Sequence, residues 1–297
     1  MIGYLAAFLS PAAFAVTNVI DAHVSGNILK KTITVVFFAS LLNGISLPFL
    51  WVFGNIGLLP LHLVPYFLIT GLIGIFYLFL YYTALKKTDT SIVSALFALG
   101  RIAAPFLAYF LIAEKLGAMQ YIGFTVTILF SMLLSLEKTD KLRINSGFWM
   151  MLCASVLVVT RDVLFKKVML EMDWMNVAFY DILFKYAFLS TFFFVAKARK
   201  EIKAIFPSYR KKIKLFFVLE ISDQLGNMFY IFALSKIPAV SMEAIFCVQP
   251  FFVLLYGLIL YKLFGDKFKE KITKKELIRK LACFTLIGIG VYLTVAG

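Results

Sequence analysis

The sequence predicts an all-α, polytopic membrane protein with ten transmembrane helices arranged as a five-plus-five inverted repeat. Of the 297 residues, 62% are hydrophobic, only 15% are charged, and the mean hydropathy is +0.92. Soluble domains are about 45–50% apolar and about 25% charged. The apolar runs are long and continuous, without the alternation of a membrane β-barrel. A soluble globular enzyme, a disordered chain and a disulfide scaffold are therefore excluded.

Apolar runs bounded by charges, Gly or Pro give the positions of the helices, because a membrane span needs about 20 apolar residues. The predicted spans are 2–20, 32–53, 65–85, 91–112, 117–136, 147–165, 175–196, 215–234, 241–261 and 281–296. All connecting loops are short, so no soluble domain is expected. The first span has no Lys or Arg before Lys30, unlike a cleaved signal peptide, and we expect it to be retained.

Lys and Arg are distributed unevenly among the loops. The odd-numbered loops contain 23 of these residues and the even-numbered loops contain 4. Because cytoplasmic loops are enriched in Lys and Arg, we expect a plasma-membrane protein with cytoplasmic odd loops and both termini outside. The net charge of +14 is then expected to face the lipid bilayer and not nucleic acid.

The two halves of the chain, 1–145 and 146–297, show weak internal similarity. Mid-span Pro105 and Pro250 are 145 residues apart, and the Ala-Leu pairs that end the third and eighth spans are 149 apart. Because each half has five spans, the two halves must insert with opposite orientations. This arrangement is typical of secondary transporters, whose substrate site lies at the repeat interface near the membrane midplane. One chain supplies both halves, so a monomer is expected to suffice.

These features resemble EamA-type transporters of the drug/metabolite transporter superfamily. Ala233-Leu234 is followed by Pro250, seventeen residues after the Ala, and Ala113-Glu114-Lys115 resembles the Gly-Glu-Arg/Lys of that family. The sequence departs from the family by having Arg101 at the Pro position of the first half, and by lacking a tryptophan in the first span. The family is often described with cytoplasmic termini, whereas the charge distribution here favours the outside.

The eighth span contains the richest polar run. Glu220, Asp223, Gln224, Asn227 and Tyr230 share one helical face because their spacings follow the helical period. This face is either a polar seam that holds neighbouring helices together or one wall of a substrate cavity. The two carboxylates favour the cavity, with Asp223 as the principal and Glu220 as the second proton-carrying candidate.

Further polar residues in the spans are candidates for the same site. Arg101 is either a counter-ion to Asp223 or Glu220, or an anchor for a substrate carboxylate or phosphate. Its position on a helix that lines the site in the resembling family favours the anchor. Tyr77, Tyr81 and Gln249 complete the predicted substrate-binding set, although aromatic residues in a Phe-rich chain also serve in packing.

A second group of polar residues is predicted to form gates or ion pairs. Asp181 and Lys185 are spaced i,i+4, which suits an internal ion pair. Asn18 and Asp21 in the first span correspond in the repeat to Arg161 and Asp162 in the sixth. The full predicted set is Asn18, Asp21, Arg161, Asp162, Asp181, Lys185 and Glu243.

The sequence contains no catalytic or cofactor motif. There is no HExxH, GxSxG or Walker A sequence, so an enzyme and direct coupling to ATP are not expected. Three cysteines without CxxC spacing and two histidines predict no metal site and no cofactor.

The predicted function is secondary transport of a small polar or zwitterionic metabolite, such as an exported amino acid. Transport would run downhill or be coupled to protons or a counter-transported solute. A flippase for a lipid-linked carrier, which would need a groove open to lipid, and a membrane scaffold are the alternatives.

Overall fold

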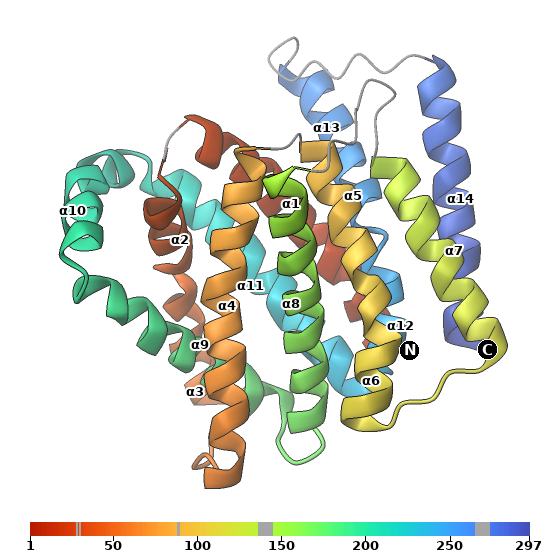
Figure 1. Cartoon of the computed structure of the whole chain (residues 1–297), viewed down its shortest axis with the longest axis horizontal. Coiled ribbons are helices and arrows are strands. Elements are labelled where there is room, and N and C mark those ends of the chain that lie inside the picture. The colour runs from red at the N-terminus through yellow and green to blue at the C-terminus, as the bar shows by residue number, and fades with distance from the viewer. Residues whose placement is uncertain (28, 30, 88–89, 136–144, 265–273) are drawn as a thin grey trace.

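A computed structural model describes the chain except residues 28, 30, 88–89, 136–144 and 265–273 (Figure 1). Throughout the described residues the regular structure is helical, without a strand. The helices are α1 (Ile2–Asn27), α2 (Thr32–Ser40), η1 (Asn43–Ile45), α3 (Ser46–Phe53), η2 (Leu61–Leu63), α4 (Val64–Leu85), α5 (Thr90–Gly100), η3 (Arg101–Ala103), α6 (Ala104–Ile112), α7 (Ala118–Ser135), α8 (Ser146–Val168), α9 (Trp174–Ser190), η4 (Thr191–Phe193), α10 (Ala196–Lys211), α11 (Ile213–Lys236), α12 (Ala239–Phe246), α13 (Gln249–Phe264) and α14 (Lys274–Ala296).

The predicted all-α, polytopic membrane fold is confirmed. Among the described residues, seven helical segments are long and apolar enough to cross a membrane, and up to eight if a bent pair forms one span. Helices occupy all ten ranges predicted from the sequence. However, α1 and α11 are not among the segments that are long and apolar enough to count as membrane spans. The count of ten spans therefore stays a prediction.

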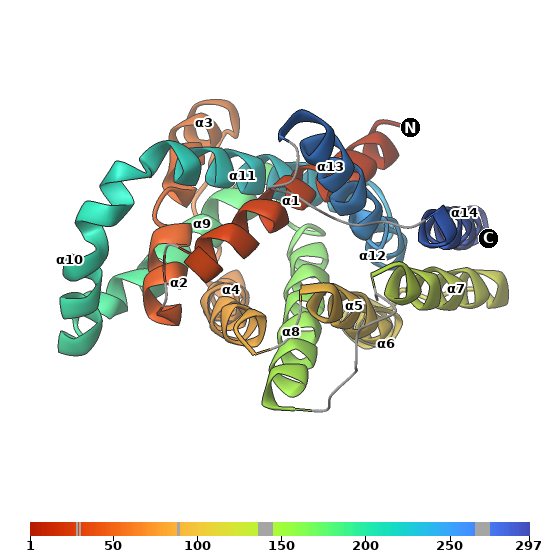
Figure 2. The ribbon, with the colours of Figure 1, turned by 90° about the horizontal axis from the view of Figure 1, so that it is seen from above.

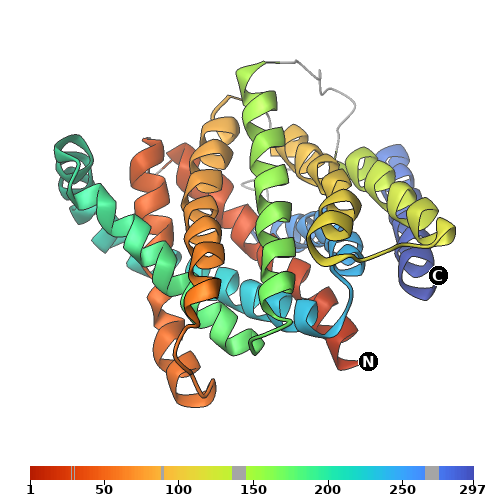
Figure 3. The ribbon, with the colours of Figure 1, turned by 60° about the horizontal axis from the view of Figure 1, so that its bottom comes forward.

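Two features of the spans differ from the sequence prediction. The predicted loop 197–214 is mostly the helix α10, which is bent by 98° from the preceding helical segment and stands at one side of the bundle (Figure 3). Its apolar residues Ala198, Ile202 and Tyr209 recur at helical spacing and are buried, while Lys31 and Glu201 form an ion pair at 2.9 Å. The many Lys and Arg residues of α10 lower its hydropathy, so a search for apolar runs does not detect this helix.

The second difference is that three predicted spans are interrupted. Span 32–53 consists of α2, η1 and α3, span 91–112 of α5, η3 and α6, and span 241–261 of α12 and α13. In the last two, Pro105 and Pro250 lie just after the interruption, at the start of the second segment. A proline at that position supplies no backbone N–H and is tolerated at a helix start.

The helices pack in pairs drawn from the two halves of the chain. α1 packs on α11, α4 on α8, and α7 on α14. Seen from above, α1 and α11 lie on one side of the bundle, α4 and α8 on the other, and α7 and α14 at one edge (Figure 2). A Cβ on Gly123 would lie 2.6 Å from the carbonyl oxygen of Gly290, so these glycines permit close contact of α7 and α14.

The turns are sorted between the two ends of the bundle. The connections α3–α4, α6–α7 and α8–α9 lie at one end, whereas the C-terminal end of α4 and the N-terminal end of α5 lie at the other (Figure 1). The N-terminal end of α1 and the C-terminal end of α14 point toward the first of these ends. The structure does not describe the basic side chains at 138–143, nor most of those at 262–280.

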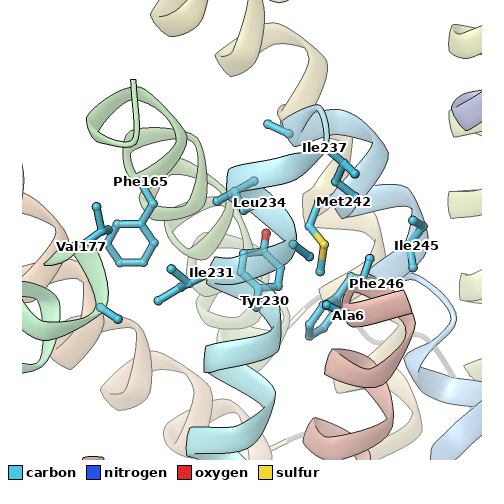
Figure 4. Close-up of a cluster of buried hydrophobic side chains, with 14 of the residues drawn as sticks. Ala6, Phe165, Val177, Tyr230, Ile231, Leu234, Ile237, Met242, Ile245 and Phe246 are labelled. Carbon is cyan, nitrogen blue, oxygen red and sulfur yellow. The ribbon is translucent and has the colours of Figure 1, made fainter. Parts of the chain in front are cut away.

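An apolar cluster fills the region between α8, α9, α11 and α12. Ile231, Leu234 and Met242 are fully buried there, beside Tyr230 and Phe246 (Figure 4). Large apolar side chains such as Trp51, Leu72 and Phe110 are exposed on the outer surface. A soluble protein would cover most of such a surface, whereas a lipid environment accommodates it.

The Ala113-Glu114-Lys115 segment, which follows α6 in the first half of the chain, forms hydrogen bonds with the start of α12 in the second half. Ala113 ends α6 in the left-handed conformation, with φ of 55°, where glycine is favoured. The Glu114 carboxylate accepts hydrogen bonds from the backbone N–H groups of Ala239 at 2.9 Å and Val240 at 3.0 Å. Glu114 thereby satisfies free N–H groups at the start of α12, where a negative charge is also favourable.

Candidate binding cavity

A cavity of about 540 Å³ lies between helices of both halves. This volume is within the range of small-molecule sites. Its walls come from α1, α2 with η1, α4, α5 with η3, α7, α8, α9, α11, and α12 with α13. The sequence-predicted residues that line it are Asn18, Asp21, Tyr77, Tyr81, Arg101, Arg161, Asp162, Lys185, Asp223, Asn227, Tyr230 and Gln249.

The polar face of α11 divides between two environments. Asp223, Asn227 and Tyr230 line the cavity, but Glu220 and Gln224 lie outside its described lining. Asn43 donates a hydrogen bond to Glu220 at 2.6 Å, and Gln224 donates to Asn43 at 2.9 Å and to Glu220 at 3.0 Å. Glu220 and Gln224 therefore form a polar seam that joins α11 to η1, whose Asn43 itself lines the cavity, and their predicted role in substrate binding stays a prediction.

Arg101 is held by a carboxylate that the sequence did not pair with it. Its guanidinium forms an ion pair with Glu243, and the Tyr230 hydroxyl donates to the other oxygen of that carboxylate. Arg101 and Glu243 are 3% and 1% exposed. The guanidinium also lies 4.2 Å from the centre of the Phe246 ring. The predicted counter-ions, Asp223 and Glu220, are not its ion-pair partners.

A second ionic network joins α8 to α9. Asp181, which is fully buried, accepts a hydrogen bond from Arg161 at 2.6 Å and pairs with Lys185 at 2.8 Å. Asp181 and Glu243 lie outside the described cavity lining, whereas their cationic partners line the cavity. The ionic networks thus form the support behind the cavity wall.

Three carboxylates face the cavity without an ion pair among the described residues: Asp21, Asp162 and Asp223. The Tyr82 hydroxyl donates to Asp21 at 2.8 Å, which gives this carboxylate one neutral partner. Asp21 on α1 and Asp223 on α11 line the cavity from two helices that pack against each other.

Two lining residues, Thr17 and Arg161, have a buried polar atom without a hydrogen-bond partner among the described residues: the Thr17 hydroxyl and the Arg161 Nε–H. Thr17 is 5% exposed, and its hydroxyl has no hydrogen-bond partner among the described residues. Buried polar groups are normally hydrogen-bonded, so each exception calls for an explanation. Thr17 and Tyr82 were not in the predicted site, although Thr17 stands in the repeat-related segment that contains Asn18 and Asp21.

The interruptions of two spans both adjoin the cavity. Arg101 belongs to η3, and Cys247 and Gln249 flank the break between α12 and α13; all three line the cavity. Ser131 donates a hydrogen bond to the carbonyl oxygen of Cys247 at 2.8 Å, which satisfies one group released by the break. Irregular backbone at membrane depth is tolerated where it is buried in protein or lines a cavity.

The bundle is that of a polytopic membrane protein with a cavity between helices of its two halves. Residues 1–136 match the EamA-like transporter family, a family of membrane transporters. This match confirms the resemblance to the drug/metabolite transporter superfamily that the sequence motifs predicted.

A comparison with solved structures supports the fold. A structure described only as "Crystal structure of protein" matches 99% of this chain and 96% of its own, with a TM-score of 0.64 and 15% identity. At this identity the likeness establishes the fold alone. No curated protein matches the sequence.

Proposed function

We propose that this protein is a secondary transporter of the plasma membrane that moves a small polar metabolite by alternating access to the central cavity. The observation that supports this best is the position of the cavity between two interrupted helical segments, α5–η3–α6 and α12–α13. Paired interruptions in corresponding spans of two halves are the feature by which transporter sites are recognised.

The proposed architecture is an inverted repeat of residues 1–145 and 146–297. If spans one to five correspond to spans six to ten, the packing of α1 on α11 has its counterpart in α8 on α4. The packing of α5 and α6 on α8 likewise has its counterpart in the packing of α12 and α13 on α1. Such reciprocal contacts support a pseudo-twofold relation, and rocking of one half against the other would then expose the cavity to each side in turn.

The proposed orientation places both termini outside the cell. The C-terminal end of α4, which Lys86 and Lys87 directly follow, lies opposite the connections α3–α4, without Lys or Arg, and α6–α7, with Lys115 alone (Figure 1). This sorting supports the interpretation of the sequence charge bias, because basic loops are retained in the cytoplasm.

Asp223 is the proposed coupling residue. It lines the cavity on α11, and it has no ion pair among the described residues, unlike Asp181 and Glu243. A carboxylate that is not committed to a structural ion pair can bind a proton in one facing state and release it in the other. Differential binding of this kind shifts the populations of the two states.

The test is a ligand screen on the purified protein. A metabolite that occupies the cavity should raise the melting temperature of the wild type, because a ligand that binds only the folded state stabilises it. Asn227→Leu, which removes a polar group from the lining, should weaken the shift, whereas the surface variant His62→Gln should not. The labelled metabolite should then exchange across proteoliposomes. Binding without exchange in any direction would contradict transport.

A further inference from the structure

We infer that the cavity selects a ligand of net positive charge, an amine whose ammonium group lies beside Asp21 and Asp223. This inference rests on the proposed function and specifies its substrate class. It differs from the sequence expectation of a zwitterionic metabolite, in which Arg101 would hold a substrate carboxylate.

The first step is the charge balance of the described lining. Its cationic residues, Arg101, Arg161 and Lys185, all pair with carboxylates that lie behind the wall. Its acidic residues, Asp21, Asp162 and Asp223, have no such pair. When Glu243 and Asp181 are included, the region contains three cationic side chains and five carboxylates. Cationic ligands are attracted by this excess, and anionic ligands are repelled.

The second step is that the charges of these cations are already balanced. Glu243 neutralises Arg101, and the fully buried Asp181 pairs with Arg161 and Lys185, so an anion would have to compete with these carboxylates even for the Arg161 Nε–H, which has no partner among the described residues. Separation would strand a buried carboxylate, and such an uncompensated charge is strongly unfavourable. A zwitterion would place its own carboxylate in the same acidic surroundings and leave the excess uncompensated.

The third step locates the ammonium group. Asp21 on α1 and Asp223 on α11 line the cavity from two helices that pack against each other. The rings of Tyr77 and Tyr81 on α4 line the same region, and aromatic faces attract cations. The buried hydroxyl of Thr17, which has no partner within the described structure, supplies an acceptor for an ammonium N–H.

The experiment uses three ligands with the same four-carbon chain and different charge: 1,4-diaminobutane, 4-aminobutyrate and succinate. Affinity for the purified protein is measured by calorimetry in detergent at constant ionic strength. We expect the diamine to bind most tightly, 4-aminobutyrate at least tenfold more weakly, and succinate not at all. Asp223→Asn and Asp21→Asn should each weaken diamine binding at least tenfold, while the surface variant Glu171→Gln should stay within twofold of wild type.

The outcomes separate this inference from the proposed function. Tighter binding of 4-aminobutyrate or succinate, or binding of none of the three, would overturn the cationic class. If Asp223→Asn unfolds, as judged by its melting temperature without ligand, Asp21→Asn alone decides the role of the acidic pair. Proteoliposome uptake is scored in parallel. Succinate uptake would support transport and overturn the cationic class, whereas diamine binding in the predicted order without uptake would support the class and overturn transport.

Discussion

The ion pair between Arg101 and Glu243 gives a prediction whose size can be worked from the structure. Both groups are almost fully buried, and Glu243 also accepts a hydrogen bond from Tyr230. Arg101→Met keeps an apolar stem of similar length but leaves this carboxylate without its cation. Breaking a buried pair in this way costs about 3–5 kcal/mol. The contact with Phe246 is lost as well, which adds about 0.5–2 kcal/mol.

A second substitution at the partner should recover most of that loss. In Arg101→Met combined with Glu243→Gln, no charge remains stranded, and the glutamine oxygen still accepts from Tyr230. We expect the double variant to lie within about 2 kcal/mol of wild type, since replacing a buried pair by neutral groups is often nearly neutral. The free energy of unfolding would be measured by SDS titration in mixed micelles. Asp223→Asn serves as the control second substitution and should give no recovery.

Two results would refute this reasoning. Recovery by Asp223→Asn and not by Glu243→Gln would show that Arg101 pairs with Asp223. A stable Arg101→Met protein that has lost ligand binding would show that Arg101 serves as a substrate anchor, as the sequence favoured.

Three further predictions concern topology, coupling and the connection of the two halves. A reporter after Gly297 should be extracytoplasmic and one within 197–214 cytoplasmic; a cytoplasmic readout after Gly297 would contradict the charge-based orientation. In vesicles supplied with saturating substrate, which offsets the weaker binding expected of Asp223→Asn, this variant should retain exchange but lose its dependence on a pH gradient; an unchanged dependence would exclude Asp223 as the coupling residue. Ala113→Gly should stabilise the fold by about 1 kcal/mol, because it relieves the left-handed backbone strain at this residue. Glu114→Ala should destabilise the fold by about 1–2 kcal/mol, because the cap of α12 is lost. Chemical unfolding measures both free energies, and a change of the opposite sign in either variant would contradict the assigned geometry.

The sequence predicts the class of fold because long apolar runs have few stable solutions in a bilayer. It does not predict the interruptions, since residues 95–112 and 239–257 remain apolar across the breaks. It also misses α10, whose many Lys and Arg residues lower the hydropathy below that of a span. The helical spacing of Ala198, Ile202 and Tyr209 is the signal that could have revealed this helix.

The site is predicted less completely, for geometric reasons. Glu220 and Asp223 are three residues apart, which on a helix of 3.6 residues per turn separates their directions by about 60°. That difference places one in a seam with Asn43 and the other on the cavity wall. The partner of Arg101 is 142 residues away in the chain, and periodicity within one helix contains no information about such a pairing.

The measurement that tests the central claim most directly is untargeted uptake by the reconstituted protein. Proteoliposomes are incubated with a mixture of soluble metabolites, and their lumenal contents are identified by mass spectrometry. The account predicts that wild-type vesicles accumulate a small set of amines, and that vesicles with Asn18→Trp, which fills the cavity from α1, do not. Lumenal contents that are the same for wild type, Asn18→Trp and protein-free vesicles would contradict transport through this cavity.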